Sequence, residues 1–171
     1  MQQIESEIKL QDIIPNIALM LQRNVKQFGE HILYREKRVG AYEGTTWDNL
    51  YEDILNIAFN LKRFGFSEGD KLVIFAPNSL KMLELELAVM ASGGIVVPIF
   101  AYFYKDTAEL LINHSDAKYL AVAGDTQLSR LEDSHVKQVF VFDDVEKHYL
   151  NNQQSFNELL VERTDKSFSL N

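Results

Sequence analysis

The side chains that could do chemistry in this sequence are few and widely spaced. The four histidines are His31, His114, His135 and His148. No two of them stand four residues apart, the spacing that places two imidazole ligands on one helix face. The sequence has no cysteine, so thiolate zinc sites, a disulfide scaffold and a cysteine nucleophile are excluded. We expect structural or solvent-exposed histidines and predict no metal site.

Two acidic pairs are candidates for acid–base or cation chemistry. Asp143 and Asp144 follow a predicted strand, where they could hold a cation or cap the next helix. We favour capping, because aspartate is a common helix N-cap residue. Glu84 and Glu86 stand two positions apart in a predicted helix, so they face different sides of it. Neither pair predicts a catalytic site.

The usual phosphate-binding and nucleophile motifs do not occur. The sequence contains no G-x-x-x-x-G-K-[ST] loop and no G-x-G-x-x-G turn. Gly93-Gly94 joins a predicted helix to a strand, whereas a phosphate loop joins a strand to a helix, so we predict a helix stop. No serine lies in a G-x-S-x-G elbow, and Ser92 precedes a strand, which is the wrong context. We predict no catalytic, cofactor-binding or metal-binding residue in this chain.

One aromatic stretch, Phe100–Tyr104, follows the end of a predicted strand. Ligands bind beyond the carboxyl ends of strands in open α/β sheets, so this stretch could line an acyl or pantetheine channel. It could equally belong to the core or pack against another part of the protein. We favour packing, because aromatic side chains dominate buried area wherever they occur.

Composition indicates an ordinary globular domain. The chain has 171 residues, of which 46% are hydrophobic and 25% charged, a length that suits one domain. The net charge of -8 and the pI near 5.0 argue against nucleic-acid binding, which needs clustered basic residues. The densest basic group, Arg35, Lys37 and Arg38, stands at a predicted hairpin tip.

The sequence also bears on location. Residues 1–7 (MQQIESE) carry acids and no apolar run, so they do not resemble a signal peptide. No apolar stretch approaches the ~20 residues that span a bilayer. We expect a cytoplasmic protein, and a peripheral membrane contact stays open.

Helical and strand patterns alternate along the chain. Apolar spacing predicts a helix over residues 12–29 and a hairpin of two short strands, 31–34 and 39–42, about a Lys37-Arg38 turn. The later expected helices are one capped by Thr45 or Thr46 and ended by Gly65, one over 80–92, one capped by Asp106 or Thr107, a short one over 126–133, and one opened by a capping box at 155–158. The expected strands are 71–76, 95–99, 119–123 and 136–142.

The spacing of the strands indicates the fold class. They begin near residues 72, 95, 119 and 137, which is typical of repeated strand–helix units with right-handed crossovers. We predict an α/β fold with a mostly parallel sheet, helices on both faces and a small preceding β-hairpin, as a single lobe over residues 1–171. Pro98 should lie at a strand end or on an edge strand, because proline cannot donate to a ladder.

Three ordered segments resemble one family, the adenylate-forming acyl-CoA synthetases. They are residues 45–50 (TTWDNL), residues 65–78 (GFSEGDKLVIFAPN) and residues 88–99 (AVMASGGIVVPI), and residues 114–122 fit the next strand. The resemblance covers about residues 10–145. The form of the third segment, and a long insertion before the expected phosphate loop, are most similar to long-chain fatty acid–CoA ligases.

The resemblance implies a function for a parent protein. Members of this family join a carboxylate to ATP with Mg²⁺, release pyrophosphate, and pass the acyl-adenylate to coenzyme A. The family's phosphate loop would be expected shortly after Asn171, so the resemblance implies an N-terminal fragment that is inactive alone, with a fatty acid as the parent's substrate. Self-association through an exposed docking face is a further expectation.

No catalytic residue carries over from the family to this chain. Thr46, Gly69, Asp70, Gly93 and Pro98 match the family pattern, with capping, turning and chain direction as their expected roles. Two other interpretations stay open, a stand-alone α/β binding or interaction module and a small flavodoxin-like regulator.

Overall fold

A five-stranded parallel sheet forms the centre of the molecule. The computed structural model describes residues 13–131, 135–146 and 150–170. The sheet strands are β3 (Lys71–Phe75), β4 (Ile95–Ile99), β5 (Tyr119–Val122), β6 (Gln138–Val141) and β7 (Gln153–Ser155). They lie in the order β4-β3-β5-β6-β7, and every neighbouring pair is parallel. The predicted α/β class with a parallel sheet is confirmed.

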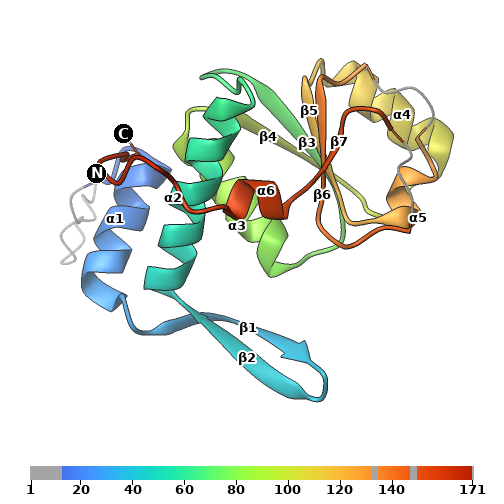
Figure 1. Cartoon of the computed structure of the whole chain (residues 1–171). Coiled ribbons are helices and arrows are strands. Elements are labelled where there is room, and N and C mark those ends of the chain that lie inside the picture. The colour runs from blue at the N-terminus through green and yellow to red at the C-terminus, as the bar shows by residue number, and fades with distance from the viewer. Residues whose placement is uncertain (1–12, 132–134, 147–149, 171) are drawn as a thin grey trace, which may run out of the picture.

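Helices cover both faces of this sheet (Figure 1). The described ranges contain six helices: α1 Ile17–Phe28, α2 Trp47–Arg63, α3 Leu80–Ala91, α4 Lys105–His114, α5 Asp125–Leu128 and α6 Asn157–Leu160. One face packs against α2, α3 and α6, with α1 outside α2, and the other face packs against α4 and α5.

The two cores follow the period of two that a strand imposes on its side chains. In β3, Leu72 and Ile74 belong to the cluster under α2 and α3, whereas Val73 and Phe75 belong to the cluster under α4. All four side chains are fully buried. A strand covered on both faces reads as a continuous apolar run, and that is why residues 71–76 show no alternation.

Helix α2 is built as its sequence predicts. The Thr46 side chain accepts the Asn49 N–H at 3.2 Å, so the expected cap is confirmed, and Asp48 stands in the first turn. Lys62 and Arg63 occupy the last turn, where cations favour the helix dipole. Gly65 follows with φ +86°, a conformation that favours glycine.

The predicted hairpin is present, but its turn lies elsewhere. Strands β1 (Ile32–Arg38) and β2 (Ala41–Thr46) are antiparallel, and Arg38 pairs with Ala41, so the turn residues are Val39 and Gly40 rather than Lys37 and Arg38. Both turn residues have positive φ, 44° and 86°, as a two-residue type I′ hairpin requires. The tip of this ribbon extends away from the helices in Figure 1, whereas Tyr34 and Glu36 of β1 line pockets beside α3.

Several predicted helix starts are wrong in detail. Helix α1 begins at Ile17 with Asn16 as its N-cap, so Pro15 lies before the helix; Asp12 lies outside the described residues. Helix α4 begins at Lys105, after Tyr104, with no side-chain cap, so neither Asp106 nor Thr107 caps it.

The region after β5 differs from expectation as well. Helix α5 covers only Asp125–Leu128, and part of the predicted 126–133 segment lies outside the described residues. The segment 153–155, whose last residue was expected to open a capping box, forms strand β7 at the edge of the described sheet. Gln153 and Ser155 pair with Val139 and Val141 of β6. Ser155 Oγ still accepts the Asn157 N–H at 3.2 Å, but it does not act as an N-cap.

Candidate functional site

The strand order creates one point where the chain reverses its direction across the sheet. From β3 the chain passes through α3 to β4 on one side, and from β4 it crosses over α4 to β5 on the other side. Helices α3 and α4 therefore lie on opposite faces, and the chain leaves the paired carboxyl ends of β3 and β5 toward opposite faces of the sheet, into α3 and α5. This topological switch point is where ligands bind in open α/β sheets.

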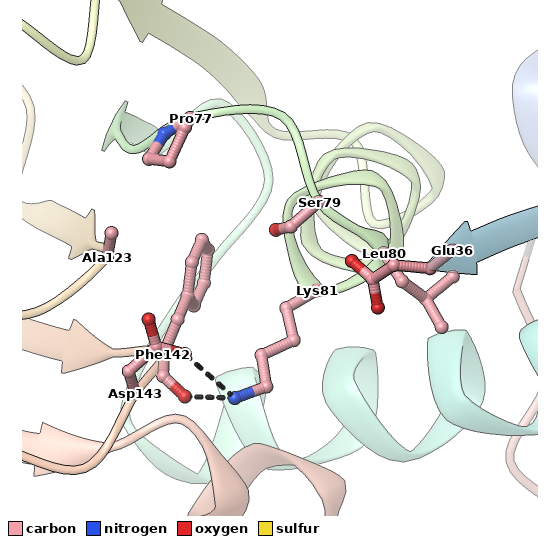
Figure 2. A pocket seen from close by; sticks show the side chains of 8 residues that line it. All are labelled: Glu36, Pro77, Ser79, Leu80, Lys81, Ala123, Phe142 and Asp143. Atoms are coloured by element: carbon pink, nitrogen blue, oxygen red, sulfur yellow. Dashed lines mark hydrogen bonds and ion pairs between the residues drawn. The ribbon is translucent and has the colours of Figure 1, made fainter. Parts of the chain in front are cut away.

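A pocket of about 340 Å³ lies at this switch point. Its lining residues come from the carboxyl ends of β3, β5 and β6, the first turn of α3, and the hairpin: Glu36, Pro77, Ser79, Leu80, Lys81, Ala123, Phe142 and Asp143. In Figure 2 the Lys81 side chain runs from α3 toward Phe142 and Asp143, while Glu36 enters beside Leu80 from β1. Segments 36, 77–81, 123 and 142–143 are thus brought together only by the fold.

Lys81 is the cation of this pocket. Its Nζ donates a hydrogen bond to the Phe142 carbonyl and lies 3.5 Å from Asp143 Oδ1. A lysine in the first turn of a helix opposes the helix dipole, so these two oxygens compensate an unfavourable position. Ser79 caps the same turn by accepting the Met82 N–H at 3.2 Å.

Two further pockets lie along α3 beside the first one, and we call the three pockets together the crevice. One, of about 430 Å³, is bounded by Ala76–Asn78, Met82 and residues 98–102. The other, of about 270 Å³, lies between Tyr34 of the hairpin and the α3 residues Met82, Leu83 and Glu86. Burial raises the pKa of the Glu86 carboxyl above its ordinary value.

The aromatic stretch forms an outward-facing turn, which we call the aromatic turn (residues 100–104). The Phe103 N–H donates to the Phe100 carbonyl at 3.1 Å, and Ala101 is buried. Phe100, Tyr102 and Tyr104 are 61%, 60% and 84% exposed, so these three side chains do not pack into the core of the described chain. Phe103 alone packs against the α4-side core.

The other predicted candidates are not assembled into a site. No helix follows Asp143 and Asp144 before residue 147, so the predicted cap is wrong, and Asp143 pairs with Lys81. Glu84 is buried and Glu86 lines the crevice, on different sides of α3 as expected. Gly93, with φ +74°, ends α3 as predicted. His148 lies outside the described residues.

Metal and MgATP are not accommodated by these residues alone. Within the described ranges, no group of three His, Asp or Glu side chains could hold a metal ion. The crevice has one lysine whose Nζ already contacts two oxygens, and the strand-to-helix connection Ala76–Ser79 carries no glycine for a phosphate to approach.

Among the described residues, no helix is long and apolar enough to cross a bilayer.

Sequence reasoning missed Lys81, Glu36, Gln127 and Arg130. The sequence signal for Lys81 was a lysine at the second position of a serine-capped helix, because the helix dipole favours acidic residues there. Glu36 reaches the crevice only through the hairpin's placement, which no local pattern records. Gln127 and Arg130 bond to backbone carbonyls more than 25 residues away.

The fold is an open parallel α/β domain with a crevice at its switch point. The family described as AMP-binding enzyme matches residues 21–167, and the chain belongs to that family. The chain spans only about a fifth of the length of the curated relatives that it matches.

Relatives of known name agree with this family. The chain is 33% identical over 106 residues to 4-hydroxybutyrate–CoA ligase 2 of Metallosphaera sedula, which covers 61% of this chain and 18% of that protein. It is 23% identical over 111 residues to long-chain-fatty-acid–CoA ligase FadD15 of Mycobacterium bovis, and this match covers 65% of this chain and 18% of that protein. The crystal structure of coronafacic acid ligase from Pectobacterium brasiliense matches with a TM-score of 0.76, 18% identity, and coverage of 90% of this chain and 31% of that one. At that identity the structural match establishes the fold.

Proposed function

We propose that this chain forms the first α/β lobe of an ATP-dependent ligase that activates a fatty acid as its adenylate and transfers the acyl group to coenzyme A. The observation that carries the proposal is the family match over residues 21–167 on a parallel sheet with a crevice at its switch point. The named relatives are CoA ligases of carboxylic acids, one of them of long-chain fatty acids.

In this proposal the lobe contributes residues that line the substrate crevice, and the residues that bind the phosphates belong to the rest of the ligase. Charge stabilisation on a transferring phosphate needs a preorganised set of donors with Mg²⁺, and the described residues do not fit MgATP. ATP, Mg²⁺ and coenzyme A are therefore assigned to the complete ligase, with residues 1–171 as one lobe of its adenylation domain. Within that lobe, the aromatic turn lines the channel of an apolar substrate arm, either the acyl chain or the pantetheine of coenzyme A.

The first experiment measures pyrophosphate release by the complete ligase polypeptide with C4 to C18 acids, with and without coenzyme A. Each buried methylene contributes ~0.8 kcal/mol, so kcat/KM should rise steeply with chain length until the channel is full. A preference for amino acids, or transfer to a carrier protein but not to coenzyme A, would assign the chain to a different ligase. Release with none of these carboxylates would overturn the proposal.

The second experiment uses the 171-residue chain alone. We expect no pyrophosphate release and no heat of MgATP binding in calorimetry. A dissociation constant of about 10 μM or tighter, equivalent to about -7 kcal/mol, would reveal a nucleotide site within these residues.

A further inference from the structure

The aromatic turn presents three aromatic side chains to solvent at the carboxyl end of the edge strand β4. Phe100, Tyr102 and Tyr104 are each at least 60% exposed, although aromatic side chains of this size gain most from burial. The Phe100 ring meets both Tyr102 and Phe103 edge-on, with ring centroids 5.5 Å apart. A turn that holds such side chains outward needs a fixed backbone, and the structure shows how that backbone is held.

Two side chains from the α5 region reach across to the backbone of this turn. Gln127 Nε2 donates to the Ala101 carbonyl at 3.0 Å, and Arg130 Nη1 donates to the Phe103 carbonyl at 2.7 Å. The remaining bonds are local, because the Phe103 N–H donates to Phe100 and the Ala108 N–H donates to Tyr104. Carbonyls at the start, middle and end of the turn thus all accept a hydrogen bond.

The donors themselves are firmly placed. Gln127 is only 4% exposed, and a buried amide is retained where it satisfies a specific partner. Its neighbour Leu128 is fully buried in the α4-side core, and Leu131, next to Arg130, is also buried there. Both side chains therefore extend from a backbone that is anchored independently of the turn.

We infer that Gln127 and Arg130 are positioning residues that fix the aromatic turn in the conformation that lines the substrate channel. The channel role rests on the proposed function above, whereas the holding of the turn rests on the two hydrogen bonds alone. Rigid aromatic groups bind with little loss of conformational entropy, so releasing the turn should weaken binding of the apolar arm and leave the other substrates unaffected.

Hydrogen exchange in the 171-residue chain tests the holding of the turn. We expect Gln127→Met and Arg130→Met to speed exchange of the Phe103 amide by about tenfold or more, while the amides of β3 and β5 keep their rates. Arg130→Lys, which retains a donor, should restore part of the protection. Thr126→Ala, an exposed neighbour on α5, is the matched control and should exchange like wild type. Unchanged exchange at Phe103 in both Met variants would overturn the inference.

Kinetics of the complete ligase tests the channel role separately. The same Met variants should raise the KM for the fatty acid or for coenzyme A by about tenfold, with the KM for MgATP unchanged. If a Met variant loses the protection of β3 and β5, the Arg130→Lys variant decides. A Phe103 amide that exchanges as fast as in the Met variant, while β3 and β5 stay protected, counts against the inference. If the Phe103 amide exchanges faster but every KM is unchanged, the two side chains do hold the turn, and the inference that the turn lines the substrate channel is wrong.

Discussion

Lys118 Nζ lies 2.6 Å from Asp70 Oδ1, so an ion pair joins the residue before β3 to the residue before β5. The other oxygen of the same carboxylate accepts the Ser67 N–H at 3.0 Å, which closes the turn that enters β3. Asp70 matched the family pattern in the sequence and was expected to serve a turn. The structure confirms that role and adds the link between two neighbouring strands.

The ion pair predicts a contribution to stability that disappears in acid. The hydrogen bond and charge of Lys118, with the Ser67 N–H, lower the pKa of Asp70 below its ordinary value of 3.8. A carboxyl with a lowered folded-state pKa adds stability above its unfolded-state pKa and loses it as the pH falls through the folded value. Urea unfolding between pH 7 and pH 3 should show a steeper acid loss for wild type than for Asp70→Asn. At pH 7 the variant should be less stable by about 0.5–1 kcal/mol, as for a partly exposed pair. Parallel pH profiles would contradict this assignment.

The hairpin turn predicts a stabilising substitution. Val39 has φ +44° and a fully exposed side chain, so a β-branched residue adopts a left-handed conformation without any packing in return. Val39→Asn should raise the free energy of unfolding of the hairpin by about 1 kcal/mol, because Asn tolerates this region. Hydrogen exchange of β1 and β2 amides measures the effect. Val39→Ile is the matched control, since it keeps the β-branched strain and should give no gain.

A buried arginine fastens the segment after α6 to helix α2. Arg163 Nη1 donates to Glu52 Oε1 at 2.6 Å and to Asn56 Oδ1 at 3.1 Å, and the Arg163 N–H donates to the same amide oxygen at 3.2 Å. Arg163 and Asn56 are both buried, so Arg163→Met should cost about 2 kcal/mol of stability. Lys166→Met, which removes an exposed cation 4.0 Å from Glu52, should cost at most about 0.5 kcal/mol. Equal thermal shifts for the two variants would show that burial adds nothing to this contact.

The exposed aromatic side chains predict self-association of the isolated chain. Monomers seldom leave apolar patches beyond several hundred Å² in water. Here Phe100 and Tyr102 line an apolar pocket, and Tyr104 of the same turn is exposed as well. Ultracentrifugation should show a concentration-dependent dimer that Tyr102→Asp and Phe100→Ser weaken. Leu110→Ser, which alters an equally exposed apolar residue on α4, should leave the dimer unchanged. Monomers at every concentration in wild type would contradict the prediction.

The sequence by itself determined the elements whose signals are local. Thr46, Ser79 and Gly93 mark helix ends through side-chain caps and a positive φ, which depend on residues three or four positions away. The continuous apolar run 72–75 predicts a strand buried on both faces, because a strand with one solvated face would alternate apolar and polar side chains. Pro98 was expected on an edge for want of an N–H group, and β4 is an edge strand of the described sheet.

Only the tertiary structure decided what depends on distant partners. Strand β7 has a polar sequence and forms because β6 offers a free edge, and Asp143 serves Lys81, 62 residues away, instead of a helix. The order β4-β3-β5 places the switch point, and with it the crevice between Lys81, Glu36 and Phe142. Strand order depends on how the crossover connections pack helices onto each face of the sheet. That packing involves the whole chain, so no short segment of the sequence predicts it.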